Sequence, residues 1–440
     1  MLRAAAQSIA LTLALVLAAC GGSGSQSAPT ARLQSSSAQV YSGQRVTLSW
    51  SSDAADTCTA SGAWSGAKAV RGSELVRPPL THSVFGLSCT GSGGTVHTEV
   101  SVTVVIPKFS AVNLGMTGAD GLNDAGGAAG WTGGLPEPAG AVVAHYAWTT
   151  GSAAPVPLPP VLPEPLASCQ FGFWDVATCS SWALAINANQ QVVVQLNCLT
   201  GNPCFPTQFL LFGAASVTPI PHLITATAIN NVPQIVGAVP FGVSQHAAIE
   251  SSGSFVDIGT LGGSESEALG VNDAGAVVGW ANLPGDSTAH AFRYANGVMS
   301  DLGTLGGTRS VANAINTAGT VAGAADVTDG NSHAFVFNGE QLLDLGTLGG
   351  AQSQATGIND AGQVVGWSDV ADPAVGPHAF LYSDGTMYDL NDYLTQTLGY
   401  PLSSGNHRIN NAGQILVTAC YQGAPHPDCQ TFLLTPQVAP

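Results

Sequence analysis

Short apolar runs bounded by polar residues follow one another through most of the chain. In residues 344–382, ATGIN leads into the turn NDAG, and QVVGW and HAFLY follow as further runs. β-Branched and aromatic residues fill these runs, while Gly, Asn, Asp and Ser bound them, as is typical of strands joined by tight turns. No stretch after residue 20 sustains apolar residues at helical spacing. The pattern therefore predicts an all-β fold with few helices.

The runs recur at a nearly fixed interval. Each copy carries a DLG-type segment, an Ile or Val before an Asn, a Gly three residues on and an apolar run, although some copies depart from this. Successive repeat asparagines are 64, 43, 42, 44, 43 and 51 residues apart: Asn123, Asn187, Asn230, Asn272, Asn316, Asn359 and Asn410. Such a period holds four short strands, one blade of a β-propeller, whereas a parallel β-helix needs shorter coils. Seven asparagines predict seven blades.

The two ends of the repeat region complement each other. The last copy stops without a DLG strand, and residues 110–115, which precede the first repeat asparagine, carry an orphan NLG. Exposed strand edges invite aggregation, so a propeller gains from pairing its ends. We therefore expect residues 109–440 to form a seven-bladed β-propeller in which this N-terminal strand completes the last blade.

Three copies contain the triplet His-Ala-Phe, at 290–292, 333–335 and 378–380, among DLGTLGG and IN-x-x-G-x-VVG motifs. These motifs resemble the HAF-repeat family of extracellular bacterial proteins. The match is weaker elsewhere, because His246 precedes Ala-Ala, His145 precedes Tyr-Ala, and Thr207 and Gln430 stand where His would fall. The resemblance implies secretion and β-repeats, and it implies no reaction.

The N-terminus has the pattern of a lipoprotein signal peptide. Arg3 precedes an apolar run over residues 9–19, and Leu17-Ala-Ala-Cys20 resembles a bacterial lipobox. The run is too short to span a membrane. We expect residues 1–19 to be removed and Cys20 to carry the lipid anchor, and Gly21 in place of Asp favours the outer membrane. Residues 20–30 then form a flexible tether.

Apart from Cys20, the chain has eight cysteines in local couples. None has CxxC spacing or a neighbouring His at zinc-like spacing, so metal binding is disfavoured. In an oxidising compartment the couples should be four disulfides. The expected pairs are Cys58–Cys89, Cys169–Cys179, Cys198–Cys204 and Cys420–Cys429.

Two further segments stand outside the repeat. Residues 31–108 alternate apolar and polar positions around one cysteine pair, which predicts a small β-sandwich that resembles bacterial immunoglobulin-like domains, with Trp64 near the bridge. Residues 153–167 are rich in proline, and we expect them to form an extended surface loop with polyproline character.

Charge excludes one class of partner. Residues 109–440 hold only Arg293, Arg309 and Arg408 as basic residues against 23 acidic residues, a net charge of −20. Phosphate would be repelled by so acidic a surface, so nucleic acid is not expected as a partner.

The recurrent histidines are the only candidate ligand set. We expect each to make the same hydrogen bond inside its own blade, because third strands lie away from a propeller axis and keep the imidazoles apart. The NDAG turns offer one carboxylate each, too few for calcium. The sequence therefore predicts no metal and no cofactor. The histidines are His145, His246, His290, His333 and His378.

Catalytic motifs such as Gly-x-Ser-x-Gly, HExxH, P-loop and Rossmann patterns are absent from the sequence. Active sites break repeat symmetry, so any site is expected in residues 132–182, 196–208 or 392–407. Loop acids available to an enzyme are unpatterned: Glu137, Glu164, Asp326, Asp329, Asp369 and Asp372.

These observations favour a tethered, non-catalytic envelope lipoprotein whose propeller binds a protein or polysaccharide. The alternatives are an enzyme that acts on extracellular carbohydrate or peptide through acidic loop residues, and an outer-membrane assembly scaffold. A cleft that gathers acids and aromatics would favour the enzyme, and a smooth apolar rim would favour the others.

Overall fold

The structure is a computed structural model that describes residues 27–79, 82–131, 145–148, 156–157, 179–198, 208–213, 216–399, 401–421 and 428–437. Strands dominate these ranges, which contain a single 3-10 helix, η3 (Leu390–Tyr393), and no α-helix, so the all-β prediction is confirmed. Within the same ranges no helix is long and apolar enough to cross a membrane. Packing divides the chain into two compact units, one built from residues before 103 and one mainly from residues 103 onward.

The N-terminal part of the described chain forms two sheets. One has the order β1 (Thr30–Ser35), β3 (Val46–Asp53), β6 (Arg71–Val76). The other has the order β2 (Gln39–Tyr41), β8 (Gly94–Val105), β7 (His82–Gly91), β4 (Thr57–Gly62), β5 (Gly66–Lys68).

A tryptophan joins the core of these two sheets. The Trp64 ring lies 5.2 Å from the Trp50 ring of β3 and 6.3 Å from the Phe85 ring of β7, both edge to face. Its indole N–H donates to the carbonyl oxygen of Gly86. The predicted disulfide Cys58–Cys89 is confirmed, and it joins the neighbouring strands β4 and β7 of one sheet. In immunoglobulin domains the conserved bridge links the two sheets instead.

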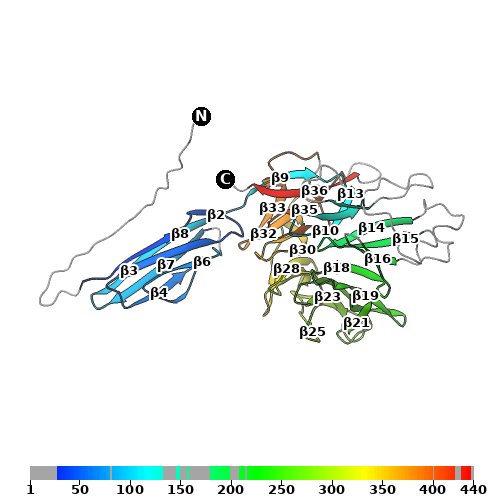
Figure 1. Ribbon diagram of the computed structural model, residues 1–440, viewed down its shortest axis with the longest axis horizontal. Coiled ribbons are helices and arrows are strands. Elements are labelled where there is room, and N and C mark those ends of the chain that lie inside the picture. The colour runs from blue at the N-terminus through cyan, green and yellow to red at the C-terminus, as the bar shows by residue number, and fades with distance from the viewer. Residues whose placement is uncertain are drawn as a thin grey trace. The chain divides into compact units, whose positions relative to one another are not determined.

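Seven four-stranded antiparallel sheets account for the strands of the described chain after residue 107, and in each of the first six the strands follow sequence order (Figure 1). The first sheet comprises β10 (Gly118–Leu122), β11 (Ala128–Trp131), β12 (His145–Trp148) and β13 (Val156–Pro157). The second comprises β14 (Cys179–Ile186), β15 (Val192–Cys198), β16 (Gln208–Phe212) and β17 (Val217–Ile220). The third comprises β18 (Thr225–Ile229), β19 (Ile235–Phe241), β20 (Ser244–Ser251) and β21 (Ser254–Gly259). The fourth sheet comprises β22 (Ser266–Val271), β23 (Val277–Asn282), β24 (Ala289–Ala295) and β25 (Val298–Asp301). The fifth comprises β26 (Gly306–Ile315), β27 (Val321–Val327), β28 (Ser332–Phe337) and β29 (Leu342–Asp344). The sixth comprises β30 (Gly349–Ile358), β31 (Val364–Val370), β32 (His378–Ser383) and β33 (Thr386–Asp389).

The seventh sheet combines both ends of this region. Its order is β34 (Arg408–Ile409), β35 (Ile415–Tyr421), β36 (Asp428–Gln437), β9 (Lys108–Asn113). In Figure 1 the cyan β9 lies beside the red β36, and the antiparallel register runs from Lys108 opposite Gln437 to Asn113 opposite Phe432. The predicted pairing of an N-terminal strand with the last copy is therefore present, with the strand at residues 108–113 instead of 110–115.

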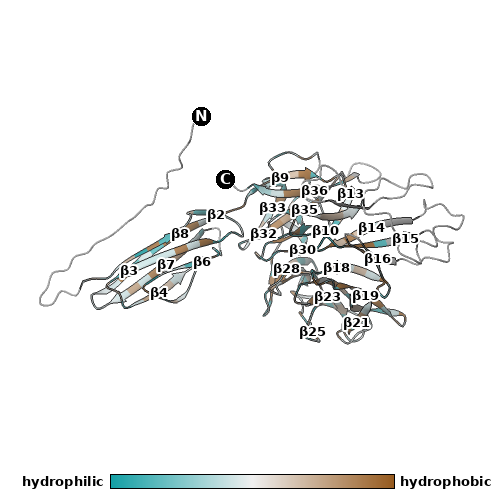
Figure 2. Ribbon diagram, viewed as in Figure 1, coloured by the Kyte–Doolittle hydropathy of each residue, from teal (hydrophilic) through white to brown (hydrophobic). Residues whose placement is uncertain are grey.

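The His-Ala-Phe triplet serves packing between neighbouring sheets. Ala291 of the fourth sheet shares a hydrophobic cluster with Phe335 of the fifth, and Ala334 shares one with Phe380 of the sixth. All four side chains are fully buried. A small residue next to a large one in each triplet thus lets successive sheets interdigitate. Most of the hydrophobic colour in Figure 2 accordingly lies along the strands.

The glycine of each VVG-type run permits a close backbone approach. A Cβ on Gly279 of β23 would lie 1.9 Å from the carbonyl oxygen of Glu267 in β22, and Gly366 has the same relation to Gln354. This contact coincides with a β-bulge in the first strand of the sheet, between Ala268 and Gly270 in β22.

One predicted loop is partly a strand. Val156 and Pro157, within the proline-rich residues 153–167, form β13 and pair with Ala147 and Tyr146. Pro157 is tolerated because β13 is the last strand of its sheet, where one row of N–H groups has no partner strand. The other residues of that loop lie outside the described ranges, as do residues 1–26, which include the expected signal peptide, Cys20 and most of the tether.

The predicted disulfide Cys420–Cys429 is confirmed and joins directly opposed residues of β35 and β36. The other two predicted pairs each include a cysteine outside the described ranges, Cys169 and Cys204. The backbone register of β14 and β15 sets Cys179 opposite Cys198.

Candidate functional site

The seven repeat asparagines form a closed cycle of hydrogen bonds. Each side-chain Nδ2 donates to the backbone carbonyl oxygen of the next repeat asparagine at 3.0 to 3.2 Å, and Asn410 donates to Asn123. Each Oδ1 accepts from the backbone N–H four residues further on. All seven side chains are buried, so their amides are committed to structure.

The residues that follow these asparagines link the turns at the surface. Asn231 donates from its backbone and side chain to the carboxylate of Asp273, both at 2.9 Å. Asn411 bonds in the same way to Asp124 and also donates to Asp360. The turn carboxylates are thus hydrogen-bonded to neighbouring turns. Across the described residues, no group of three or more His, Cys, Asp or Glu side chains has the arrangement of a metal site.

The recurrent histidines pair with the aspartate of the DLG-type segment in their own sheet. Nδ1 lies 2.6 to 3.0 Å from the nearer carboxylate oxygen in four copies, as the sequence predicts for a bond within one blade. The side chain of His145 lies outside the described part of the chain. The four pairs are His246–Asp257, His290–Asp301, His333–Asp344 and His378–Asp389.

The seventh sheet has a neutral version of this pair. Asn113 of β9 takes the place of the aspartate and donates to Oε1 of Gln430 at 2.8 Å, and its own Oδ1 accepts from the backbone of Gly115. In the fourth sheet, Asp301 accepts from Gly303 in the same way. Because Gln and Asn satisfy the same geometry without a titratable group, the pair is primarily structural.

The sixth copy breaks the repeat after its His–Asp pair. Asn391 replaces the usual glycine and donates twice to Oδ1 of Asp389, each at 2.9 Å. Its own amide then bonds to Leu402, accepting from the backbone N–H at 2.8 Å and donating to the carbonyl oxygen at 3.2 Å. The Asn391 side chain thus joins the beginning of the loop at residues 390–402 to its end. The loop belongs to the 51-residue step, the longest among the last five.

The loop also covers the free edge of β9. Thr395 donates from its backbone to the carbonyl oxygen of Phe109 at 2.8 Å, and Gln396 donates from its side chain to that of Ala111 at 2.9 Å. Lys108 donates to the carbonyl oxygen of Asp392, and its ammonium lies 4.9 Å from the centre of the Tyr393 ring. The loop therefore protects the strand that joins the chain ends.

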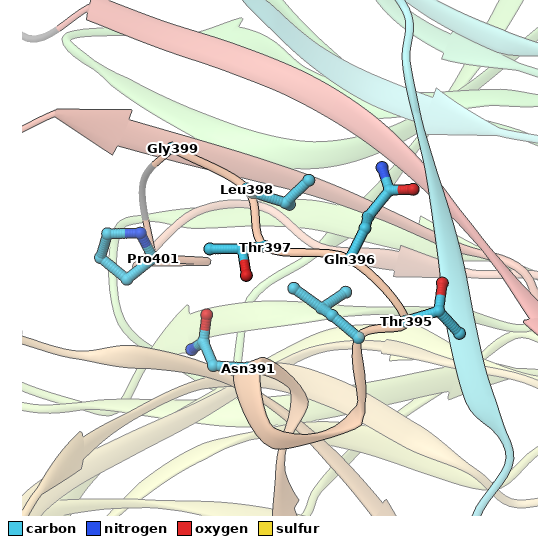
Figure 3. Close-up of a pocket in the computed structure, with 8 residues that line it drawn as sticks. Asn391, Thr395, Gln396, Thr397, Leu398, Gly399 and Pro401 are labelled. Carbon is cyan, nitrogen blue, oxygen red and sulfur yellow. The ribbon is translucent and has the colours of Figure 1, made fainter.

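The loop contributes to the lining of two hollows. The first, of about 420 Å³, lies within the loop, where Asn391, Thr397 and Pro401 face one another (Figure 3). It has no ionisable side chain in its lining. The second, here the His378 hollow, has about 560 Å³ and is lined by Leu348, Val370, Ala371, Asp372, Val375, His378, Met387, Tyr388, Asp389, Asp392 and Tyr393.

The His378 hollow combines hydrogen-bond acceptors with aromatic rings. The rings of Tyr388 and Tyr393 meet edge to face, with centres 5.7 Å apart. Burial, together with Tyr388 and Asp392, raises the pKa of Tyr393 above its usual value, so its phenol is neutral at physiological pH. His378 Nδ1 lies 2.6 Å from Asp389 Oδ2, whereas its Nε2 is buried and has no hydrogen-bond partner among the described residues. No other recurrent histidine with a described side chain has a buried, unpartnered Nε2.

The loop acids expected for an enzyme are not brought together as a set. Asp326 accepts from Arg309 in its own sheet, and Asp329 accepts from the backbone of Asn331, a bond that lowers its pKa. Only Asp372 of that set lines the His378 hollow; Glu137 and Glu164 lie outside the described ranges. Sequence patterns did not identify Asp392, Tyr388 and Tyr393 as candidate site residues, although any site was expected in one of three segments that include residues 392–407.

A fully buried histidine precedes the last sheet. His407 is fully buried, and its Nε2 donates to the carbonyl oxygen of Ser403 at 2.9 Å. Burial lowers its pKa to about 4, and the neighbouring Arg408 acts in the same direction. The imidazole is therefore neutral at physiological pH.

No family model matches the sequence, and no curated protein matches it. Among solved structures, TolB from Acinetobacter baumannii is similar over 69% of this chain and 75% of its own, with 11% identity and a TM-score of 0.40. A protein of unknown function from Bacteroides thetaiotaomicron covers 91% of this chain and 98% of its own, with 10% identity and a TM-score of 0.33. A quinoprotein alcohol dehydrogenase-like protein from the same organism covers 89% and 90%, with 11% identity and a TM-score of 0.31.

Proposed function

We propose that the seven four-stranded sheets are the blades of a seven-bladed β-propeller closed by β9, and that the preceding sheets are an immunoglobulin-like module. The cycle of seven asparagine bonds supports the ring, because it returns from Asn410 to Asn123. The module has two sheets with a shared core, although its disulfide lies within one of them.

The propeller acts as a non-catalytic binding module of the cell envelope. The observation that carries this proposal is the His378 hollow, where the sixth copy departs from the repeat after its His–Asp pair and gathers acceptors and tyrosine rings. Concave sites with a few placed polar groups among apolar side chains are typical of ligand binding.

The protein is anchored to the outer membrane by lipid at Cys20, with residues 20–30 as the tether. The lipobox supports this anchor, and the disulfides Cys58–Cys89 and Cys420–Cys429 agree with an oxidising envelope compartment. The ligand is then an envelope protein or polysaccharide within reach of the tether.

Binding to envelope material tests this function. The protein from residue 21 onward is added to washed envelopes, and parallel samples are treated with protease or with periodate, which destroys vicinal diols. Saturable binding that one treatment abolishes is the expected result and assigns the ligand to protein or polysaccharide. Absence of saturable binding to every sample would contradict the proposal.

An enzyme that acts on carbohydrate is the second candidate, because acids and aromatics do share this hollow. Hydrolysis of a glycosidic bond commonly needs two carboxyl groups about 5–10 Å apart. Asp389 already accepts from His378 and Asn391, which leaves Asp372 and Asp392 for such roles. Release of reducing ends from oligosaccharides, lost in both D372N and D392N, would favour this candidate; no release is expected.

A further inference from the structure

We infer that the His378 hollow binds a neutral, hydroxyl-rich saccharide unit, which donates a hydroxyl hydrogen bond to Nε2 of His378 and stacks on Tyr388. This inference rests on the proposed binding function and names its ligand class. It starts from the Nε2 atom because buried polar atoms nearly always have a hydrogen-bond partner, and this one has none among the described residues.

The hydrogen bond to Asp389 decides what Nε2 can accept. A carboxylate only accepts hydrogen bonds, so Nδ1 of His378 carries a proton, and in the neutral form of an imidazole protonated at Nδ1 the lone pair is on Nε2. Asn391 fixes Asp389 from the other side through two further bonds. The imidazole is thus held in one tautomer, and its free nitrogen requires a ligand that donates.

The rest of the lining is also rich in acceptors. Asp372 and Asp392 add carboxylates to the same hollow, which disfavours sulfate, phosphate and uronic-acid groups by charge. Sugar hydroxyls can donate to every one of these acceptors. A cationic side chain could also do so, but its ammonium would have to lose water to reach the buried Nε2, a cost that a neutral hydroxyl avoids.

The tyrosines supply the apolar part of recognition. Tyr388 is partly exposed and meets Tyr393 edge to face, while Lys108 lies over the Tyr393 ring. Tyr388 is therefore the ring that can present a face to a pyranose. The hollow of about 560 Å³ falls in the range of small-molecule sites and can admit a saccharide unit of an open chain.

The repeat provides matched controls in the fifth sheet. His333 bonds to Asp344 as His378 bonds to Asp389, and Leu343 precedes Asp344 as Tyr388 precedes Asp389. H378F and H333F each remove one His–Asp bond, and Y388A and L343A each truncate the same strand position. Only H378F and Y388A change the lining of the His378 hollow.

The experiment measures binding of a panel of neutral, aminated and uronic-acid oligosaccharides to the protein from residue 21 onward, followed by calorimetric titration of the best neutral ligand. We expect H378F and Y388A each to raise its Kd about tenfold or more, the effect of one lost hydrogen bond or stacking contact, while H333F and L343A keep the wild-type Kd. Melting curves of the two variants in each pair show whether both substitutions change the stability of the protein equally.

Four results overturn the inference. Neutral-saccharide binding that survives in H378F and Y388A would put the binding site elsewhere, and binding of uronic-acid ligands alone would refute the acceptor argument. Binding only to protein in treated envelopes would also refute it, yet leave the binding function standing. No binding to any glycan or envelope sample would remove both the inference and the proposed function.

Discussion

Asn410 donates a hydrogen bond from its side-chain amide to the backbone carbonyl oxygen of Asn123, at 3.0 Å and across 287 residues of sequence. The six remaining consecutive pairs of repeat asparagines are joined by the same kind of bond. The amide is suited to this role because Oδ1 can accept within its own turn while Nδ2 donates to the next. One side chain thus shapes a turn and connects two sheets.

Replacement of one repeat asparagine by aspartate should destabilise the protein. In N316D a carboxylate oxygen replaces the Nδ2 that donates to Asn359 at 3.2 Å, so two acceptors would face each other in a buried site. We expect a loss of about 2–3 kcal/mol in the free energy of unfolding, measured with urea. The control is N338D, because Asn338 only accepts, from Glu340 and Gln341, and should change stability by less than about 0.5 kcal/mol. Equal effects would refute a donor role for Asn316.

The buried His407 should make stability fall in mild acid. Its pKa is about 4 in the folded protein against 6.5 for the free side chain, so the unfolded chain binds more protons between these values. Stability contributed by the neutral ring is complete above pH 6.5 and is lost as pH falls toward 4. The loss in the free energy of unfolding approaches about 3 kcal/mol.

Urea unfolding at pH 8, 6 and 4 tests this titration. The free energy of unfolding should depend less steeply on pH in H407Q than in wild type or in H97Q, which alters an exposed histidine. Parallel curves for H407Q and wild type would contradict a neutral buried ring.

Disulfide mapping distinguishes two pairings in the second sheet. The sequence predicts Cys169–Cys179 and Cys198–Cys204, whereas the backbone register sets Cys179 opposite Cys198. Both bridges of the described chain join directly opposed residues, Cys58 with Cys89 and Cys420 with Cys429. We therefore expect non-reduced peptide maps to show Cys179–Cys198, with Cys169 bonded to Cys204. Peptides that join Cys169 to Cys179 would contradict this pairing and support Cys169–Cys179 with Cys198–Cys204.

The lipid anchor is tested at Cys20. C20A should lose lipid labelling and accumulate outside the membrane fraction, because the cysteine is the acceptor of the diacylglyceryl group in the expected lipobox. Wild-type protein should be labelled and sediment with outer membranes. A C20A protein that stays in the membrane at wild-type levels would contradict a lipid anchor at Cys20.

The repeat made the strands predictable, because apolar alternation and turn residues act locally. The same period marked the seven asparagines, and the orphan NLG marked the strand that pairs with β36. The loop at residues 390–402 was not predictable in form, since Asn391 fixes it through Leu402 and β9 lies against it from another part of the chain. Asn391, which stands where other copies have the glycine of the DLG-type segment, is the one local signal of the hollow. Val156–Pro157 shows the opposite case, in which pairing to β12 overrides a loop composition.

The closed ring is tested most directly by a covalent bond between its two ends. Ser110 of β9 lies directly opposite Thr435 of β36, and opposed residues on antiparallel strands have Cα separations that suit a disulfide. S110C/T435C is oxidised and mapped without reduction, and S110C/S254C, whose second site is in the third sheet, is the control. We expect a disulfide between the two introduced cysteines of S110C/T435C in monomeric protein, a melting temperature higher when oxidised than reduced, and no new bridge in the control. Free thiols at both positions in oxidised S110C/T435C, or bridges from them to other cysteines, would contradict the ring.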